Sequence, residues 1–296
     1  MRTLRLLGLA TLAVVVIASG APAQDASWPK ELTFALLSTE NAAEITRRWT
    51  PIIAQLEKDL RVRVKAVTAT DYRGTIEALK FKKAELGHLG PKAYVEAATN
   101  NYANVEPVAQ LQLANGSLGY RSCLIVHGES DMFSPEDTAG RSFAFNDPNS
   151  TSGYLVPSAF FMMEMGIDPQ KHFSKVIFSG SHEASILAVA NRKVEVASTN
   201  LPDMQQLTRE NKIGRGALRV IWVSKLIPND PVVVRKDLPA SLKAAIQESL
   251  VSMKSRNPEA FKEIGAWLGN FVPADDAKYQ VIRELNETAK RLKAAK

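Results

Sequence analysis

The strongest constraint on the fold is a regular alternation of short apolar segments with amphipathic segments. Apolar runs such as residues 32–37 and 194–197 have the length of strands. The segments that follow them repeat apolar residues at helical spacing. Because strands that alternate with helices pack as α/β layers, the chain is predicted to be an α/β protein with largely parallel sheets.

Capping signals place several of the predicted helices. Thr50 followed by Pro51 has the pattern of an N-cap with proline at the first helical position, and residues 52–60 continue with helical spacing. Beyond residue 238 the chain is predicted to be mostly helical, in three segments: 239–253, 258–268 and 275–292.

The length of 296 residues exceeds what one hydrophobic core usually organises, so two domains are expected. No linker separates two α/β units, which predicts a chain that crosses over and returns, near residues 117–120 and 223–228. Such a layout leaves a ligand cleft between two lobes. The predicted domains are a signal peptide at 1–23, a discontinuous lobe 1 at 24–119 plus 225–296, and lobe 2 at 120–224.

The N-terminus has the features of an export signal. Arg2 and Arg5 precede an apolar run at residues 6–18, and small residues at 21–23 resemble a signal-peptidase site. The apolar run is shorter than the roughly 20 residues that span a bilayer. No cysteine lies near the cleavage point. We therefore expect a soluble periplasmic protein without a lipid anchor.

Charge and cysteine content narrow the possible functions further. The formal net charge of +6 falls to +4 once the signal peptide takes away its two arginines, and the remaining charges form no Lys/Arg block. Nucleic-acid binding is therefore not expected. Cys123 is the only cysteine and cannot form an internal disulfide. It is interpreted as a buried core residue, with a soft ligand for a thiophilic species as the alternative.

Hydroxyl side chains gather where predicted strands pass into helices. Ser150, Thr151 and Ser152 follow a strand at 142–145 and begin an apolar helix that runs to residue 165. Unpaired backbone N–H groups and the positive end of the helix dipole lie at such a position. The three residues can therefore surround a tetrahedral oxyanion; ordinary N-capping is the alternative.

Two other junctions repeat this pattern. His182 lies where a β-rich run enters the next helix, and its imidazole could donate to an anion. The first strand ends at Ser38, Thr39 and Glu40, so Thr39 is a further candidate at a carboxyl edge.

Several motifs together resemble the periplasmic phosphonate-binding proteins. They occur in that family's order and at its approximate spacing over residues 31 to about 236. They are DPNSTSG at 147–153, WTP at 49–51, DY at 71–72, GY at 119–120, HE at 182–183 with LAVAN at 187–191, and LIP at 226–228 with DP at 230–231.

The resemblance implies a two-lobed periplasmic binding protein fold of type II, with the ligand held between the lobes. It implies that the hydroxyls at 150–152 and His182 hold the phosphonate oxygens, and that Tyr72 reaches across from the other lobe. Asp230 matches a carboxylate that faces the ammonium group of aminoalkylphosphonates, and Asn200 is a further predicted ligand-binding residue.

Two departures bear on the ligand. Leu89 stands where these relatives have a second aromatic hydroxyl. Residues 200–203 read NLPD where they have a second carboxylate, so Asp203 substitutes only if the loop shifts by one residue. A buried ammonium with one carboxylate is poorly compensated, which favours phosphite, methylphosphonate or phosphate, with Asp230 accepting a hydrogen bond from a P–OH group.

The predicted function is capture of a phosphorus oxyanion for an inner-membrane ABC permease, by a monomer with no metal and no cofactor. The alternative is an arsenite- or oxyanion-sensing protein that partners a signalling receptor through Cys123. An enzyme is not expected, since the chain has no G-x-S-x-G elbow, no Walker loop and no H-E-x-x-H helix.

Overall fold

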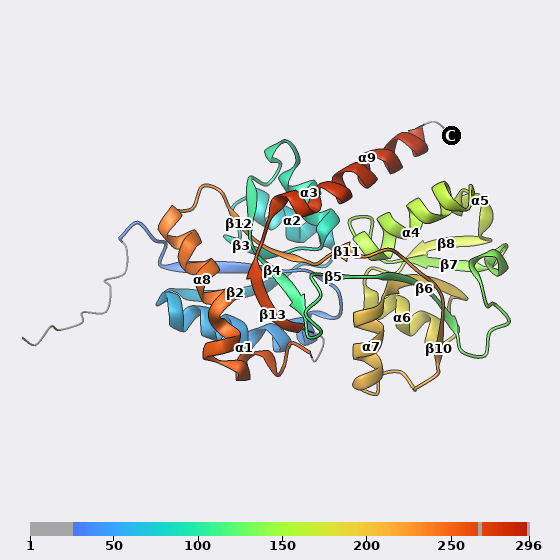
Figure 1. Ribbon diagram of the computed structural model, residues 1–296, viewed down its shortest axis with the longest axis horizontal. Helices are drawn as coiled ribbons and strands as arrows, with labels where there is room; N and C mark the ends of the chain where they lie inside the picture. Colours follow the sequence, from blue (N-terminus) through green and yellow to red (C-terminus); the bar gives the residue numbers. More distant parts are fainter. Residues whose placement is uncertain (1–25, 266–267, 295–296) are drawn as a thin grey trace, which may run out of the picture.

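The alternating strands and helices form two α/β lobes, each built on its own sheet (Figure 1). The computed structural model describes residues 26–265 and 268–294. The predicted signal peptide therefore lies outside the described residues. Within those residues, no helix has both the length and the apolar character needed to cross a membrane.

Lobe 1 contains the six-stranded sheet, in the order β13-β4-β12-β3-β1-β2. Strand β1 runs parallel to β2 and β3, whereas β12 runs antiparallel to β3 and β4. The strands are β1 (Glu31–Leu36), β2 (Arg63–Thr68), β3 (Leu86–His88), β4 (Val105–Leu113), β12 (Pro231–Arg235) and β13 (Leu268–Pro273).

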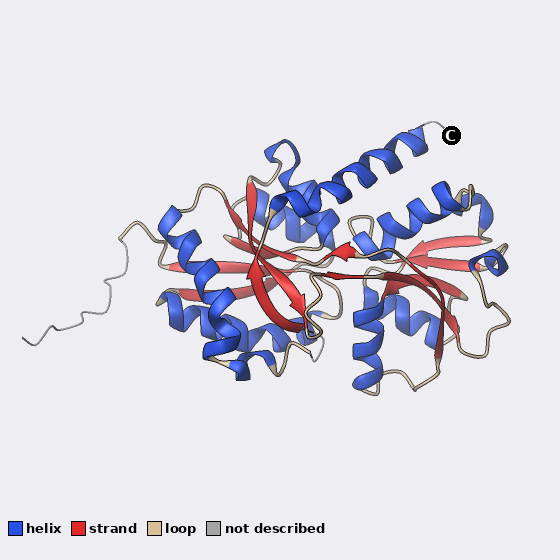
Figure 2. Cartoon of the chain, viewed as in Figure 1, coloured by secondary structure: helices blue, strands red, loops and turns tan. Residues whose placement is uncertain are grey.

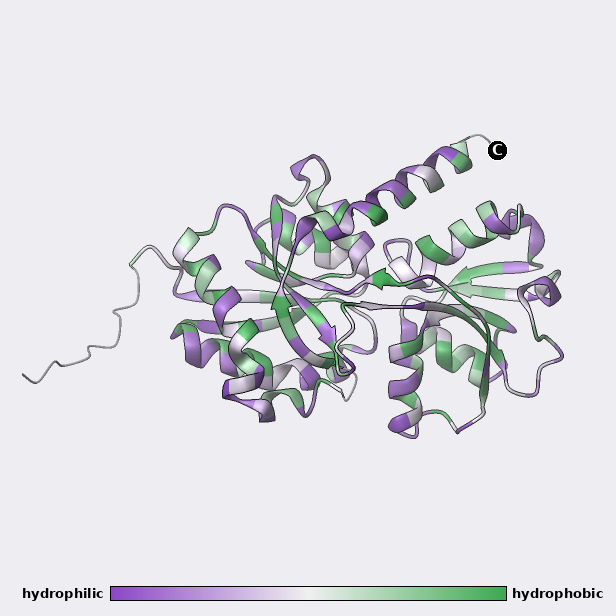
Figure 3. Ribbon diagram, viewed as in Figure 1, coloured by the Kyte–Doolittle hydropathy of each residue, from purple (hydrophilic) through white to green (hydrophobic). Residues whose placement is uncertain are grey.

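Helices cover both faces of this sheet (Figure 2). They are α1 (Ala42–Leu60), α2 (Tyr72–Lys80), α3 (Pro91–Ala98), α8 (Ala240–Arg256) and α9 (Gln280–Ala294). Phe34 of β1 packs edge-on against Trp49 of α1, with ring centroids 5.4 Å apart. Hydrophobic residues lie along the central strands, and α9 carries mostly hydrophilic residues (Figure 3).

The predicted start of the first helix is wrong. Helix α1 begins at Ala42, and the side chain of Asn41 caps it by accepting a hydrogen bond from the backbone N–H of Glu44. Pro51 lies inside the helix. Ile45 and Trp49 precede it and are buried at 3% and 5% exposure, so the apolar face of the helix extends back past the proline. Packing of that face outweighs the local signal of Thr50 and Pro51.

Lobe 2 contains the five-stranded sheet, in the order β10-β6-β9-β7-β8. Its strands are β6 (Ser122–His127), β7 (Ser142–Phe145), β8 (Lys175–Phe178), β9 (Val196–Asn200) and β10 (Leu218–Val223). Its helices are α4 (Val156–Ala159) between two π-helical turns (Thr151–Leu155 and Phe160–Glu164), α5 (Pro169–His172), α6 (His182–Ala190) and α7 (Leu201–Arg209).

The prediction of largely parallel sheets is wrong, because both sheets are mixed. In lobe 2, β7 runs parallel to β8 and β9, but β6 runs antiparallel to β9 and β10. The chain enters lobe 2 through β6 and leaves it through β10, so these two strands must run in opposite directions. The same reasoning applies in lobe 1 to β4 and β12, by which the chain leaves and returns.

The two crossings pair with each other. Strands β5 (Gly119–Tyr120) and β11 (Ile227–Pro228) form a two-stranded antiparallel sheet between the lobes, at the crossings predicted from the sequence (Figure 1). A Cβ atom on Gly119 would lie 2.5 Å from the carbonyl oxygen of Ile227, so the close approach of the strands requires glycine here. The exact lobe boundaries stay a prediction.

The prediction of a helix over 258–268 is also wrong. After α8 the chain makes a 3₁₀ turn (Pro258–Phe261), and β13 then adds to the edge of the sheet beside β4. Phe271 of β13 is fully buried and contacts Trp49 and Phe261. The open edge of β4 supplies hydrogen-bond partners that the sequence pattern does not reveal.

Candidate ligand-binding cleft

A cavity of about 60 Å³ lies between the lobes, where the loops after several strands meet. All the predicted site residues except Ser152 line it. The lining residues are Leu37, Thr39, Tyr72, His88, Gly90, Leu111, Leu113, Tyr120, Ser150, Thr151, His182, Asn200, Pro202, Asp203, Asn229 and Asp230.

Ser150 and Thr151 each use the hydroxyl oxygen to accept a hydrogen bond from a backbone N–H. Ser150 caps the helix, and its Oγ accepts a hydrogen bond from the N–H of Gly153 at 2.9 Å. The Oγ1 of Thr151 accepts from the N–H of Lys92 in lobe 1 at 2.8 Å. Because each hydroxyl oxygen already accepts from a backbone N–H, each O–H is left to donate elsewhere. The hydroxyl of Thr151 also hydrogen-bonds to the phenol of Tyr120, which lines the same cavity. Both residues are at most 2% exposed.

The helix start is shaped by close backbone packing. A Cβ atom on Gly153 would lie 2.4 Å from the side chain of Asn146. Asn146 is held in turn by the Ser185 hydroxyl, which donates to its Oδ1 at 2.7 Å. The N–H of Leu155 bonds to the carbonyl of Ser150, so the first turn is a wide π-helical one.

His182 lies deep in the cleft at the N-terminus of α6 and is 4% exposed. Its Nδ1 is 3.0 Å from the hydroxyl of Thr199, and its Nε2 is 3.5 Å from the hydroxyl of Ser152. Burial lowers the pKa of His182 to about 4, although the charge of Asp230 opposes the shift. The imidazole is therefore neutral near pH 7 and acts as a hydrogen-bonding group.

Two carboxylates line the cavity. Asp230 lies 3.3 Å from the Nε2 of His88. Asp203 lies in the first turn of α7, where its carboxylate accepts a hydrogen bond from the side chain of Asn200 at 2.7 Å. Burial raises the pKa of Asp203 to about 6, and Asp230 adds to the shift. The structure thus brings Asp203 into the cleft, with Pro202 beside it.

Besides Asp203, three polar residues of the cavity lining were not predicted as site residues: His88, Tyr120 and Asn229. Leu89, at the position compared with an aromatic hydroxyl, packs into the core of lobe 1 and does not line the cavity. Side chains alternate along a strand, and the β3 signal at 85–89 could have assigned His88 to the face opposite Leu89. Tyr120 and Asn229 lie at the crossings, where only the tertiary fold places them.

Tyr72 and Tyr120 face the same cavity from α2 and from β5. Burial raises the pKa of both phenols, with the charges of Asp203 and Asp230 adding to the shift. Both are therefore neutral at ordinary pH and can donate a hydrogen bond.

Cys123 does not line the cavity. It is fully buried beside Ile125, Ala144 and Ile186, and burial raises the pKa of its thiol. The interpretation of Cys123 as a core residue is confirmed.

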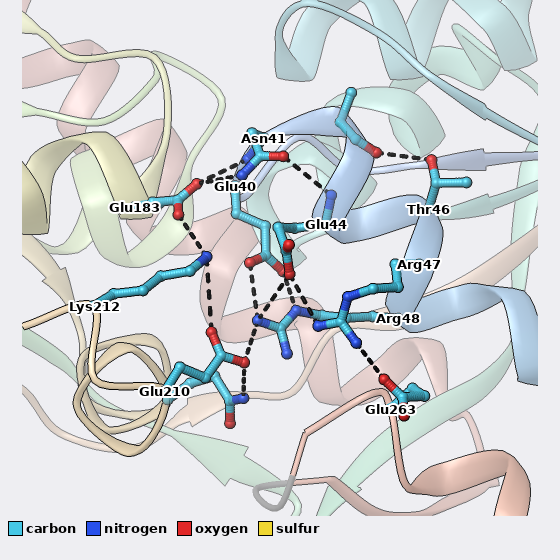
Figure 4. Close-up of polar contacts among 12 residues, drawn as sticks. Glu40, Asn41, Glu44, Thr46, Arg47, Arg48, Glu183, Glu210, Lys212 and Glu263 are labelled. Carbon is cyan, nitrogen blue, oxygen red and sulfur yellow. Dashed lines mark hydrogen bonds and ion pairs between the residues drawn. The ribbon is translucent and has the colours of Figure 1, made fainter.

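A group of charged and polar residues joins the lobes beside the cavity, and we call it the cross-lobe cluster (Figure 4). It consists of Glu40, Asn41 and Arg48 from lobe 1, with Glu183, Glu210 and Lys212 from lobe 2. Burial raises the pKa of Glu40 to about 7, although Arg48 opposes the shift.

The comparison with known families agrees with this geometry. The family described as "ABC transporter, phosphonate, periplasmic substrate-binding protein" matches residues 34–279. The chain belongs to this family.

Relatives of this phosphonate-binding family member span most of its length. The phosphonates-binding periplasmic protein of Escherichia coli is 35% identical over 269 residues, which is 89% of this chain and 78% of that protein. The binding protein component of a phosphonate ABC transporter from Pseudomonas aeruginosa is 33% identical, with a TM-score of 0.82 over 90% of this chain and 88% of that chain.

A more distant structure shares the fold. PhnD1 from Prochlorococcus marinus, solved in complex with methylphosphonate, has a TM-score of 0.78 at 21% identity, over 88% of this chain and 98% of that chain. The predicted two-lobed periplasmic binding protein fold is confirmed. The resemblance of the sequence motifs to the periplasmic phosphonate-binding proteins is confirmed as well.

Proposed function

We propose that this protein captures a phosphorus oxyanion in the periplasm and delivers it unchanged to an inner-membrane ABC permease. The observation that carries the proposal is the pair of hydroxyl groups on Ser150 and Thr151, at a helix start that faces the cavity between the two lobes. Neutral donors and the helix N-terminus bind a tetrahedral anion without a cationic side chain.

The ligand contacts are proposed as two groups. The phosphorus oxygens are held by Ser150, Thr151, Tyr72 and His182. Ser152 does not line the cavity and positions His182 through the contact between their side chains. The other residues of the predicted site line the remaining wall: Thr39, Asn200 and Asp230. The protein acts as a monomer without a cofactor, and it performs no chemistry on the ligand.

The small cavity supports a small ligand such as methylphosphonate or phosphite. Asp203 favours a second candidate, a phosphonate that carries an ammonium group, because two carboxylates now line the cavity. A cation beside Asp203 would lower its pKa, so binding would release a proton between about pH 4 and 6. A neutral substituent would release none.

Calorimetry and thermal shift with a ligand panel test the proposal. The panel consists of methylphosphonate, 2-aminoethylphosphonate, phosphite, phosphate and arsenite. We expect at least one phosphorus oxyanion to raise the melting temperature. Repeating the titration in buffers of different ionisation enthalpy measures the protons released and separates the two ligand classes.

Recovery of the ligand completes the test. Phosphorus NMR after incubation should show the phosphonate unchanged, whereas turnover would make the protein an enzyme. Wild-type affinity in the double variant Ser150→Ala, Thr151→Ala would show that the anion binds elsewhere. Arsenite binding that is lost in Cys123→Ser would favour the sensing alternative.

A further inference from the structure

Arg48 connects the two lobes while almost buried. Its side chain is 6% exposed, and its Nε donates to Glu40 of the same lobe at 2.7 Å. Its Nη2 donates to Glu210 of lobe 2 at 2.6 Å. Glu210 is the C-cap residue of α7 and Glu40 precedes α1, so one guanidinium on α1 joins the loop before that helix to the end of α7.

Glu183 makes a second connection from lobe 2. Its Oε2 accepts hydrogen bonds from the backbone N–H and the side chain of Asn41, at 3.0 and 3.2 Å. Its own N–H donates to the carbonyl of Thr39 at 3.2 Å. Although burial opposes the shift, Lys212 and Asn41 lower the pKa of Glu183, so the carboxylate is charged near neutral pH.

These connections hold the segments that carry the cavity residues. Thr39 precedes Glu40, His182 precedes Glu183, and α7 carries Asp203 in its first turn. A second cavity of about 40 Å³ lies between the cluster and the ligand cavity and shares Thr39, His88 and Asp203 with it. The cluster therefore lies directly behind one wall of the proposed ligand site.

We propose that Arg48, Glu183 and Glu210 are positioning residues that hold the lobes together around the ligand, and that they thereby set its dissociation rate. The inference rests on the proposed function. None of the three lines the ligand cavity, so they act through the loops that do. When the lobes separate, Arg48 loses Glu210 and Glu183 loses Asn41, while water must rehydrate the separated groups.

Removal of a cross-lobe partner should change dissociation more than association. Encounter takes place with the open protein, before these contacts form, whereas release requires them to break. Losing one partner of a buried charged pair acts mainly on the off-rate. We expect Glu210→Gln and Glu183→Gln each to accelerate dissociation about tenfold, with the association rate unchanged.

Stopped-flow fluorescence of the full chain measures both rates. Trp49, whose ring lies 4.8 Å from that of His88, is a built-in reporter beside the cluster. The probe is methylphosphonate, with 2-aminoethylphosphonate as the second probe. Glu195→Gln is the matched control, because it removes a carboxylate that pairs with Arg141 inside lobe 2.

A double-mutant cycle separates positioning from general damage. Glu210→Gln should accelerate dissociation much less in an Arg48→Gln background than in wild type, because the partner is already gone. This inference would be overturned by wild-type dissociation rates in Glu210→Gln and Glu183→Gln, or by equal acceleration in Glu195→Gln. Either result would leave the proposed function standing. Failure of wild type to bind either probe would overturn the proposed function and this inference with it.

Discussion

At the scale of single residues, the site depends on groups that make two hydrogen bonds at once. The sequence leaves open whether the hydroxyls at 150–152 cap a helix or bind an anion. The structure shows that capping and anion binding are compatible. Ser150 accepts from Gly153 and Thr151 accepts from Lys92, so the proton of each hydroxyl is left for a partner other than these backbone groups.

Thr151→Val tests this arrangement with little change of shape. The variant loses a hydroxyl that we expect to donate to a charged oxygen, a hydrogen bond worth about 1.5–3 kcal/mol. Calorimetry should show affinity for the cognate oxyanion weakened about 10- to 100-fold. Thr208→Val is the control, since its hydroxyl bonds only to the Met204 carbonyl within α7. Equal affinity in Thr151→Val and wild type would contradict the assignment.

Asp203 gives a pH-dependent prediction. Its folded-state pKa of about 6 lies above the ordinary value of 3.8, so the unfolded chain loses this proton first as pH rises. The Asp203 contribution therefore destabilises the fold progressively from about pH 4 to 6. Asp203→Asn should be more stable than wild type by up to about 3 kcal/mol at pH 7, and equal to it below pH 4.

Denaturant unfolding of the ligand-free protein at several pH values measures this difference. Asp237→Asn is a control of opposite sign, because Lys82 and Arg235 lower the pKa of Asp237 and its charge stabilises the fold. A stability gain in Asp203→Asn that persists undiminished at pH 3.5 would show that titration is not its cause.

At the scale of elements, the start of the proposed anion-binding helix depends on one small residue. Gly153 packs against Asn146, and the widened π-helical turn at Thr151–Leu155 places the hydroxyls at the cavity. The sequence predicts a helix here and identifies its N-terminus. It does not predict the π-helical turn, where Ser122 of β6 and Ser198 of β9 donate hydrogen bonds to the carbonyls of Ser152 and Gly153.

Gly153→Ala should therefore be costly. The added Cβ would overlap the Asn146 side chain at 2.4–2.6 Å. Overpacking of this kind costs about 1–3 kcal/mol, a fall of several degrees in Tm. Gly214→Ala is the control, because its Cβ would meet no atom within 4 Å. Thermal unfolding of the two variants checks the prediction, and equal melting temperatures would contradict it.

The element predictions fail where local signals compete with distant partners. The Thr50 and Pro51 signal is real, but the buried face of α1 continues through it to Ile45. The helix predicted over 258–268 gives way to β13 because an open strand edge lies nearby. Periodicity describes one segment and carries no information about the edge with which it will pair.

At the scale of the whole molecule, two paired crossings and a long C-terminal helix connect the lobes. Strands β5 and β11 form the only short sheet between the lobes within residues 26–265 and 268–294. Helix α9 extends from lobe 1 towards lobe 2, where Lys293 contacts the hydroxyl of Tyr154 (Figure 1). The lobes can move apart only if the chain bends at the two crossings and the contact of Lys293 with Tyr154 breaks.

Ligand binding should therefore compact the molecule. Without ligand, the cross-lobe contacts compete with water at the cleft, and a bound oxyanion adds hydrogen bonds to both lobes. Small-angle scattering should show a smaller radius of gyration with saturating oxyanion than without it. Identical scattering curves for the free and the saturated protein would contradict closure on ligand.

The sequence by itself determines the α/β composition, the two crossings and the hydroxyl-rich helix start, because each depends on short-range periodicity or on a contiguous motif. Only the tertiary structure decides the mixed sheet order, the place of His88, Tyr120 and Asn229 in the cavity, and the cross-lobe cluster. Arg48 and Glu210 are 162 positions apart, and no local pattern encodes their contact. Such pairs form only when the two lobes meet across the cavity.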